Sequence, residues 1–289
     1  MDHRYLATTR ISLPAIGLGT WQYKGGTEAL RVGIALGACF IDTAESYGSE
    51  EVVGQAIRGI RKDIFLATKV SPRHFRPADV MAAADGSLKR LNTDYVDLYQ
   101  LHWPNYTVPI EETMRAMEQL VDSGKVRFIG VSNFFVRDLQ NAQKAMTKHK
   151  IVSNQVRYNL IDRSIELGLL EYCQKHNITI IAHSPLATDL ARIKARDPER
   201  VIDRVAEDRS ITPAQVALNW CISKAGIVTI PKSNSIEHVK ENCTASEFRL
   251  FPEDLQLLDR NVRHGRRSSF EIRLRSWARY GLQIFGRSQ

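Results

Sequence analysis

Four polar side chains that follow or close short apolar runs could together deliver a proton. Asp42 ends the run Cys39–Asp42, Tyr47 follows five residues later, and Lys69 and His102 end two later runs. A tyrosine hydroxyl, with a pKa near 10, is a poor acid or base at neutral pH unless its surroundings shift that pKa. A nearby ammonium stabilises the phenolate and lowers the pKa, and an aspartate in contact keeps the ammonium charged where it is partly buried. An imidazole can orient a carbonyl oxygen or relay a proton.

The four residues therefore predict a site that protonates a developing alkoxide. None of these groups can reduce a substrate, so the electrons must come from elsewhere. Each residue also has a structural interpretation. Asp42 could cap a helix that begins near Ser49, and Tyr47 could be a packing residue. Lys69 could be a solvated lysine and His102 a core histidine.

These side chains need a scaffold that brings several strand ends together. From Ala15 onward, short apolar runs alternate with stretches of helical periodicity. The runs are Ala15–Gly19, Cys39–Asp42, Ile64–Lys69, Tyr95–His102, Val126–Asn133, Ser153–Arg157, Ile178–Ser184 and Ile227–Ser233. The helical stretches include Thr27–Leu36, Pro77–Leu91, Ile110–Ser123, Val136–Lys148, Ile165–His176, Thr212–Ala225 and Ile236–Asn242.

This alternation predicts an α/β fold. Short apolar runs between helices are typical of parallel strands buried on both faces, and eight of them at a spacing of roughly 30 residues predict a closed (β/α)8 barrel. An open doubly wound sheet is the alternative, but Gly17–Thr20 lacks the G-x-G-x-x-G spacing expected after its first strand. We expect one domain over 1–289, with a small hairpin at Tyr5–Pro14, the barrel at about 15–259 and a tail at 260–289.

Polar residues end nearly every expected strand. They are Asp42, Lys69, His102, Ser132, Asn133, Gln155, His183, Ser184, Lys232 and Ser233. The carboxyl ends of barrel strands open on one face, and a polar group there costs free energy unless it is paired, so the set predicts a site. Ser132, Asn133 and Gln155 suit a carboxamide. Lys232–Asn234, ahead of a helical stretch, suits a phosphate, although a solvated loop lysine is the simpler interpretation of Lys232.

Composition narrows the class of protein. Apolar residues at 43% and charged residues at 25% are ordinary for a globular protein. No run approaches the ~18 apolar residues of a membrane span, and no signal peptide is evident. The four cysteines show no metal or disulfide spacing, which suits the cytoplasm. The charge of +8 is concentrated in 260–289, where eight arginines and one glutamate give +7. The body is nearly neutral, so nucleic acid is not an expected partner.

Several ordered motifs resemble the aldo-keto reductase superfamily over about residues 10–259. They are IGLGTW (Ile16–Trp21), FIDTAESYGSEEVVGQAI (Phe40–Ile57), LATKV (Leu66–Val70), DLYQLHWP (Asp97–Pro104), GKVRFIGVSNF (Gly124–Phe134), NQVRYN (Asn154–Asn159) and IPKSNSIEHVKEN (Ile230–Asn242). The resemblance implies a (β/α)8 barrel that reduces aldehydes or ketones with NADPH, without metal or flavin. The nicotinamide would deliver hydride to the carbonyl carbon.

The resemblance also implies roles for individual residues. The catalytic tetrad falls on Asp42, Tyr47, Lys69 and His102, with Tyr47 as the proton donor. Trp21 and Trp103 match positions that line the substrate pocket. The positions that match cofactor contacts are Thr20, Ser132, Asn133, Gln155, His183, Ser184, Leu186, Lys232, Ser233, Asn234, His238, Glu241 and Asn242.

Two histidines depart from the family pattern. His183 stands where the family usually has a tyrosine stacked on the nicotinamide, and an imidazole offers less area and can titrate. His238 stands where an arginine usually grips the 2′-phosphate. Arginine is always charged and bidentate, whereas a histidine with an ordinary pKa is mostly neutral at pH 7. We therefore expect NADPH to be preferred through Lys232, less strongly than usual and less as pH rises past 7, with NADH as an alternative cofactor.

The third departure is the tail Arg263–Gln289. Four apolar residues of the tail fall on one face of an expected helix: Phe270, Leu274, Trp277 and Ile284. Most of the arginines lie off that face. We expect the tail to pack on the barrel, and a basic helix on an anionic membrane surface is the alternative. If it covers the mouth of the site, its arginines would favour anionic carbonyl substrates.

The expected function is a cytoplasmic, monomeric carbonyl reductase that acts on small molecules. A regulatory nucleotide-binding protein with the same fold and slow turnover is the alternative, supported by His183 and the tail. Tyr47 and Lys69 together favour the enzyme, because a pure binding protein needs neither. A lyase or aldolase is disfavoured, since no Schiff-base context or metal triad is evident.

Overall fold

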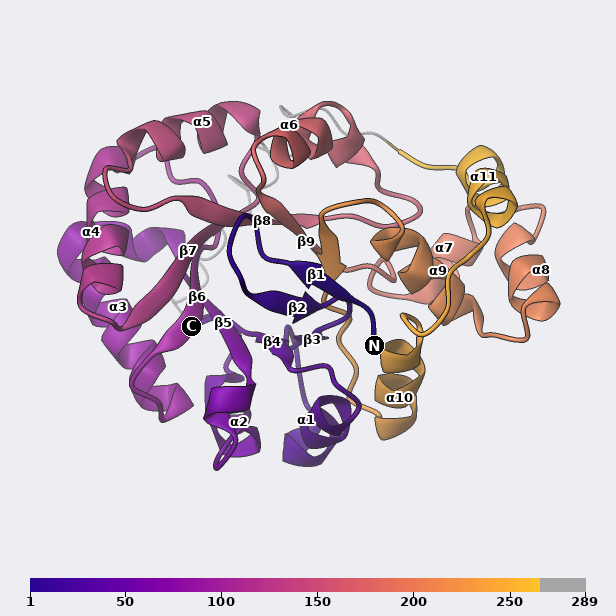
Figure 1. Ribbon diagram of the computed structural model, residues 1–289, viewed down its shortest axis with the longest axis horizontal. Helices are drawn as coiled ribbons and strands as arrows, with labels where there is room; N and C mark the ends of the chain where they lie inside the picture. The colour runs from indigo at the N-terminus through magenta and orange to yellow at the C-terminus, as the bar shows by residue number, and fades with distance from the viewer. Residues whose placement is uncertain (266–289) are drawn as a thin grey trace, which may run out of the picture.

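The computed structural model describes residues 1–265, and a barrel of parallel strands forms its centre (Figure 1). The strands are β3 (Leu18–Gly19), β4 (Phe40–Asp42), β5 (Phe65–Val70), β6 (Val96–Leu101), β7 (Val126–Ser132), β8 (Ile151–Arg157), β9 (Thr179–His183) and β10 (Ile227–Thr229). They pair in chain order. The two end strands also meet, since Gly17 donates to the Thr229 carbonyl at 2.8 Å and Thr229 to that of Ala15 at 2.8 Å. The predicted closed barrel is confirmed, and the open sheet was the wrong alternative.

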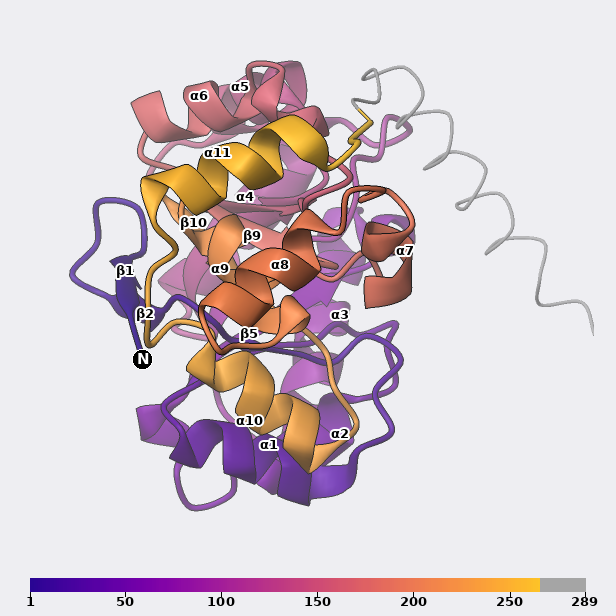
Figure 2. The same ribbon diagram turned by 90° about the vertical axis from the view of Figure 1, so that its right-hand side faces the viewer.

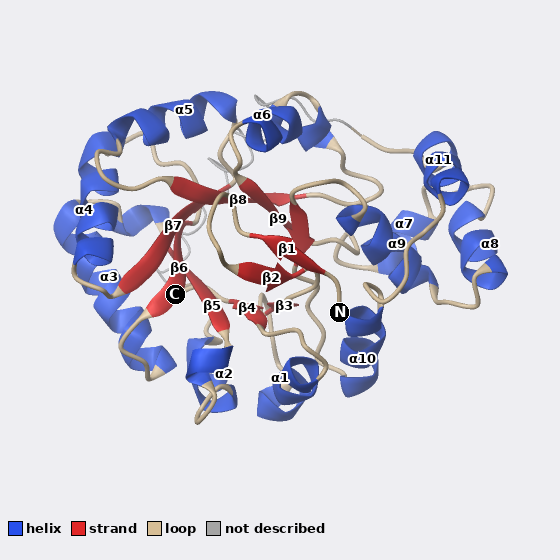
Figure 3. Cartoon of the chain, in the orientation of Figure 1, coloured by secondary structure: helices blue, strands red, loops and turns tan. Residues whose placement is uncertain are grey.

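Helices surround the barrel (Figure 3). They are α1 (Gly26–Ala35), α2 (Glu50–Ala56), α3 (Pro77–Leu91), α4 (Ile110–Asp122), α5 (Val136–Ala145), α6 (Leu169–Lys175), α7 (Leu190–Lys194), α8 (Val201–Asp208), α9 (Pro213–Ile222), α10 (Ile236–Thr244) and α11 (Pro252–Asn261). Short 3-10 turns lie at Arg61–Asp63, Pro72–His74 and Ser164–Glu166. The sequence pattern did not predict α7, α8 or α11. The five residues of α7 are too few to show a helical period. In α8 the signal was present and was missed, because Val201, Ile202, Val205 and Ala206 fall on one buried face.

Local chemistry sets several element ends. Pro77 starts α3, and Asn92, in the left-handed conformation at φ 52°, ends it. The expected helix Ile165–His176 is split by Gly168, whose φ of 96° interrupts the helix. The last strand ends at Thr229 rather than at Ser233, because Pro231 has no N–H to donate to a sheet.

The predicted N-terminal hairpin is present as β1 (His3–Tyr5) and β2 (Ser12–Pro14), and it begins at His3 rather than at Tyr5. It closes one end of the barrel. Leu6 and Leu13 of this hairpin are fully buried in an inner core with residues from the barrel strands. Ala7 donates to the hydroxyl of Thr179, the first residue of β9, at 2.8 Å, so the hairpin lies at the amino ends of the strands. Figure 2 shows the hairpin on the side opposite α7. The hairpin therefore leaves the carboxyl ends of the barrel strands open for a functional site.

The cysteines, the question of a membrane span and the C-terminal tail were also subjects of the sequence-based expectations. The four cysteines are free; Cys221 is buried and Cys39 is half-buried. No helix within residues 1–265 is long and apolar enough to cross a membrane. The helical stripe predicted at Phe270–Ile284 lies outside the described residues.

The buried Glu118 on α4 holds the loop that leads into β8. Its carboxylate accepts hydrogen bonds from the backbone N–H groups of Thr147, Lys148 and His149 at 2.9, 2.6 and 3.0 Å. Burial alone would raise the pKa of Glu118, but these donors outweigh it and hold the pKa at about 2, against an ordinary 4.5. The charged form is therefore the one that stabilises the fold.

We expect Glu118→Gln to lower the free energy of unfolding at pH 7 by about 1–3 kcal/mol, the usual contribution of hydrogen bonds to a charged group. Because the folded-state pKa is depressed, the stability is present above pH 4.5 and is lost as pH falls toward 2. Urea unfolding at several pH values should show the wild type and the variant converging in acid. Glu111→Gln, on the exposed first turn of α4, is the control. A difference that does not change with pH would contradict this role.

Candidate active site

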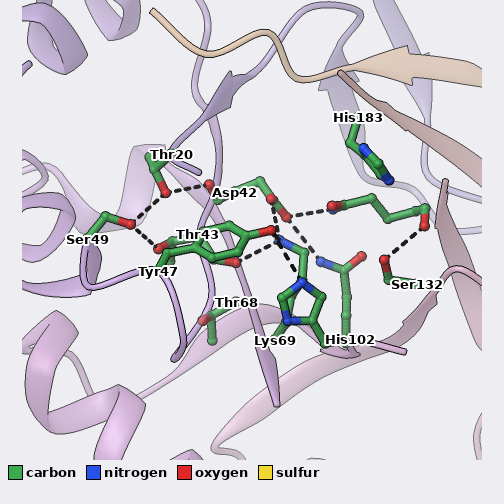
Figure 4. Close-up of polar contacts among 12 residues, drawn as sticks. Thr20, Asp42, Thr43, Tyr47, Ser49, Thr68, Lys69, His102, Ser132 and His183 are labelled. Atoms are coloured by element: carbon green, nitrogen blue, oxygen red, sulfur yellow. Dashed lines mark hydrogen bonds and ion pairs between the residues drawn. The ribbon is translucent and has the colours of Figure 1, made fainter. Parts of the chain in front are cut away.

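An ion pair inside the barrel forms the centre of the site (Figure 4). Lys69, at the end of β5, is fully buried, and its Nζ donates to Asp42 Oδ1 at 2.5 Å and to the carbonyl of Thr43 at 2.9 Å. Burial lowers the pKa of Lys69, but the Asp42 carboxylate and Tyr47 outweigh it, and the net pKa is raised. Lys69 is therefore an ammonium and not a solvated lysine. Asp42 pairs with it and does not cap α2, where Ser49 occupies the N-cap position.

Tyr47 lies between the ammonium and an imidazole. Its hydroxyl is 3.4 Å from Lys69 Nζ and 3.4 Å from His102 Nε2, and Lys69 Nζ lies 4.7 Å from the centre of its ring. The expectation of a lowered phenol pKa is wrong for this structure. Burial raises the pKa of Tyr47 and Asp42 adds to the rise, and Lys69 only partly opposes them. At neutral pH Tyr47 is a phenol, the form that can donate a proton.

His102 is neutral in the same surroundings. Burial, followed by the positive charge of Lys69 and by His183, keeps the pKa of His102 well below its ordinary value. A neutral imidazole can both donate and accept a hydrogen bond. The structure thus brings together the four residues that the sequence singled out.

A chain of hydroxyl groups holds the loop between β4 and α2. Thr20 donates to the Asp42 carbonyl at 2.9 Å, Ser49 donates to Thr20 at 2.9 Å, and the hydroxyl of Thr43 lies 2.9 Å from that of Ser49 (Figure 4). This chain fixes both ends of the segment that carries Tyr47. The sequence analysis missed the roles of Thr43 and Ser49, although both belong to the motif that contains Asp42.

Two glutamines bind the second oxygen of Asp42. Gln155 Nε2 donates to Oδ2 at 2.7 Å and Gln100 Nε2 donates to it at 3.1 Å. Gln100, on β6, was not among the expected site residues. Its signal in the sequence is a glutamine within the apolar strand DLYQLH, two residues before His102.

The ends of β7, β8 and β9 bring neutral polar groups to the same face. Ser132 donates to the backbone carbonyl of Gln155 at 2.9 Å, and Asn133 Nδ2 donates to the Ser132 hydroxyl at 2.9 Å and to the His102 carbonyl at 3.2 Å. His183 Nε2 lies 3.4 Å from Asn133 Oδ1. These residues are adjacent, as expected. The Ser132 hydroxyl, the Asn133 amide and the Gln155 amide nitrogen all have partners within the protein, so a ligand that binds here would share or replace these hydrogen bonds.

The other expected cofactor residues surround the loop after β10. Gly19, the register partner of Asp42, donates to the Pro231 carbonyl at 3.0 Å, and an added Cβ at Gly19 would lie 2.5 Å from the Ile230 carbonyl oxygen. A small pocket beside this contact is lined by Leu18, Gly19, Pro231, Ser233, Val239 and Asn242, among others. Lys232, Asn234 and His238 are exposed, and Glu241 is half-buried. These residues therefore lie on or beside the loop that follows β10, which packs against Gly19 at the end of β3.

Ser184 and Leu186 follow β9, near the same face. Ser184 has a φ of 52°, and its carbonyl accepts from Asn159 at 2.9 Å. Leu186 is half-buried and packs against the hydrophobic core.

The two tryptophans expected to line a substrate pocket differ in exposure. Trp103 is half-buried and stacks on His102, with ring centres 6.4 Å apart. Trp21 is 46% exposed.

Together, the parallel barrel and its buried acid–base groups define an enzyme-like site that can give a proton to a substrate, although its side chains cannot supply electrons. Within residues 1–265, no group of three or more His, Cys, Asp or Glu side chains is placed to hold a metal ion. Residues 15–263 match the model of the Aldo/keto reductase family, and the chain belongs to this family.

Individual relatives agree with this assignment. The chain is similar to methylglyoxal reductase YeaE of Escherichia coli, at 41% identity over 86% of this chain and 91% of that protein. It is similar to glyoxal reductase of Bacillus subtilis, at 36% identity over 86% and 89% of the two chains. Among solved structures, it resembles an aldo/keto reductase from Klebsiella pneumoniae in complex with NADP and acetate. That match has a TM-score of 0.84 and 41% identity, and covers 93% of this chain and 98% of the other.

Proposed function

We propose that this aldo-keto reductase reduces aldehydes and ketones to alcohols with NADPH, and that Tyr47 protonates the carbonyl oxygen. The observation that carries the proposal is the position of the Tyr47 hydroxyl, 3.4 Å from both Lys69 Nζ and His102 Nε2, above a buried ion pair. A regulatory nucleotide-binding protein would need no such arrangement.

The raised pKa of Tyr47 keeps its proton in place at neutral pH. When the hydroxyl gives this proton to a substrate oxygen, negative charge develops on the phenol oxygen, and the Lys69 ammonium stabilises it. Asp42 keeps Lys69 charged in the core. The neutral His102 can hydrogen-bond to the carbonyl oxygen and orient it toward Tyr47.

Bound NADPH would supply the hydride for this reaction. We assign the nicotinamide carboxamide to Asn133 and Gln155, with Ser132 holding Asn133, and we assign the ring face to His183. Thr20, Ser184 and Leu186 would line the same cofactor site. The 2′-phosphate falls to Lys232, Ser233, Asn234 and His238, and the adenine to Glu241 and Asn242. A helix N-terminus beside Lys232 favours an anion there.

The substrate is a small carbonyl compound in this proposal. Trp21 and Trp103 would provide apolar walls beside His102. The relatives named methylglyoxal reductase and glyoxal reductase make small dicarbonyls the first compounds to test. The four catalytic candidates come from one chain, so a monomer is sufficient for the chemistry.

The test is NADPH oxidation by the purified protein with methylglyoxal, glyoxal, an aromatic aldehyde, a diketone and a sugar. We expect turnover with at least one dicarbonyl. Tight NADPH binding without turnover of any carbonyl would contradict the proposal and favour the regulatory alternative.

The 2′-phosphate assignment predicts which substitution strengthens the preference for NADPH. His238→Arg should raise the ratio of kcat/KM with NADPH to that with NADH, because an arginine is always charged and can bind a phosphate with two parallel hydrogen bonds. Steady-state kinetics with both cofactors would measure the ratio. An unchanged ratio in His238→Arg would contradict the position assigned to the 2′-phosphate.

A further inference from the structure

We propose that Gln100 is a positioning residue, which orients the Asp42 carboxylate and thereby keeps Lys69 in place beside Tyr47. The inference rests on the proposed function, in which Lys69 stabilises the Tyr47 phenolate. Gln100 is fully buried on β6, and its Nε2 donates to Asp42 Oδ2 at 3.1 Å.

The two oxygens of Asp42 have different partners. Oδ1 accepts from Lys69 at 2.5 Å, and Oδ2 accepts from Gln155 at 2.7 Å and from Gln100 at 3.1 Å. A carboxylate with donors on both oxygens cannot rotate without breaking a hydrogen bond. The two amides therefore hold Oδ1 toward Lys69.

The two glutamines lie in the same layer of the barrel interior. Gln100 pairs with Gly130 on β7, and Gly130 pairs with Ser153 on β8, two residues before Gln155. Strands in a closed barrel are tilted and staggered, so alternate strands such as β6 and β8 contribute side chains to one layer. Both glutamines therefore reach Asp42 Oδ2. Gln155 is also assigned to the nicotinamide carboxamide under the proposed function, so Gln100 is the one whose effect on Asp42 can be tested apart from cofactor binding.

Net stability gives little reason for a glutamine at this position, because the hydrogen bond to Asp42 and the unpaired oxygen of the same amide have opposite effects of similar size. Gln100 Oε1 is buried and has no hydrogen-bond partner among residues 1–265. An unpaired buried acceptor costs about 1–3 kcal/mol, and an apolar side chain of similar length would avoid that cost. The contribution of the amide is therefore the hydrogen bond that it donates to Asp42.

Lys69 depends on the orientation of Asp42. Burial lowers the pKa of Lys69, and the contact with Asp42 is the first of the effects that raise it. A carboxylate that turns away would leave the ammonium less well held, and Tyr47 would lose part of the charge that stabilises its phenolate. The effect belongs to the chemical step and not to cofactor binding.

The first experiment replaces Gln100 by methionine, which has similar length and no donor. We expect Gln100→Met to lower kcat roughly tenfold, as the loss of one hydrogen bond to a charged group would. The Kd for NADPH should not change, and the melting temperature should be equal or higher. Leu98→Met, two residues earlier in the same inner core, controls for repacking and should leave kcat unchanged. An unchanged kcat in Gln100→Met would overturn the proposal.

The second experiment is a double-mutant cycle with Asp42→Asn, which separates positioning from packing. In that background, Gln100→Met should cause no further loss of kcat. An equal loss in both backgrounds would overturn the proposal.

A third experiment uses Gln100→Glu, which keeps the shape of the side chain but puts a second carboxylate beside Asp42. Its kcat should be lower than that of Gln100→Met at pH 7 and should recover in part as pH falls. A pH profile identical to that of Gln100→Met would count against the contact with Asp42.

The melting temperatures of the wild type, Gln100→Met, Asp42→Asn and the double mutant test the contact between Gln100 and Asp42 without measuring activity. The shifts caused by Asp42→Asn and Gln100→Met should be non-additive, because the first removes the charge to which Gln100 donates. Additive shifts would refute the coupling. A wild type that reduces no carbonyl would refute the proposed function, while the melting cycle would still decide whether Gln100 holds Asp42.

Discussion

Tyr47→Phe is expected to lower kcat for carbonyl reduction by about 10²–10⁴-fold, the usual contribution of one positioned proton donor. The variant loses only the hydroxyl. The ring keeps its contacts with Lys69, at 4.7 Å, and with the His102 ring, at 5.5 Å between centres. The fold and NADPH affinity should therefore change little, and the loss should lie in kcat.

Single-turnover and steady-state rates with one dicarbonyl would measure the effect, and fluorescence titration would confirm NADPH binding. Tyr172→Phe, on α6 and outside the barrel, removes a phenol hydroxyl far from the site and should keep wild-type activity. Because the pKa of Tyr47 is raised, the wild-type rate of reduction should fall only on the alkaline side, as the phenol loses its proton. Activity within a few-fold of wild type in Tyr47→Phe would exclude Tyr47 as the donor.

Lys69→Met is expected to destabilise the protein by about 3–5 kcal/mol and to abolish most activity. The replacement leaves the Asp42 carboxylate buried without its counter-charge, which is far more costly than removing both charges. Asp42→Asn together with Lys69→Met should therefore regain much of the lost stability. It should not regain activity, because nothing would stabilise the Tyr47 phenolate.

Urea unfolding at neutral pH would measure the first effect. The pKa of Lys69 is raised in the folded protein, so its contribution is complete below the ordinary value of 10.5 and is lost as pH rises through the folded value. Lys148→Met breaks an exposed pair with Asp122 and should have little effect. If Lys69→Met alone were no less stable than the double mutant, the unpaired Asp42 carboxylate would not be the cause of the destabilisation.

The barrel could be predicted because its signal is local. A strand buried on both faces needs an apolar run, and such a run can be recognised from the local sequence alone. A polar residue such as Lys69 or His102 then marks where the run ends. The same local signals predicted α3 to the residue. They failed for α7, whose five residues are too few for a period to emerge, and for the last strand, which Pro231 ends early. The helical period of α8 was present in the sequence and was missed.

Within the site, the sequence alone was enough to select Asp42, Tyr47, Lys69 and His102 as candidates. They stand at or just beyond the ends of apolar runs, and the resemblance to the family implied the roles proposed for them. Only the tertiary structure decided their electrostatics. The pKa of Tyr47 is raised and not lowered, because burial outweighs the ammonium. Burial depends on the whole barrel closing around a side chain.

The contact between Asp42 and its second glutamine, Gln100, likewise depends on the fold alone. Gln100 and Asp42 are 58 residues apart and meet because their strands face the same barrel interior. No spacing in the sequence reports that contact. Local pattern thus selected the candidates for the proposed acid–base groups, and the packing of β4, β5, β6 and β8 around one carboxylate determined how those residues are charged and held.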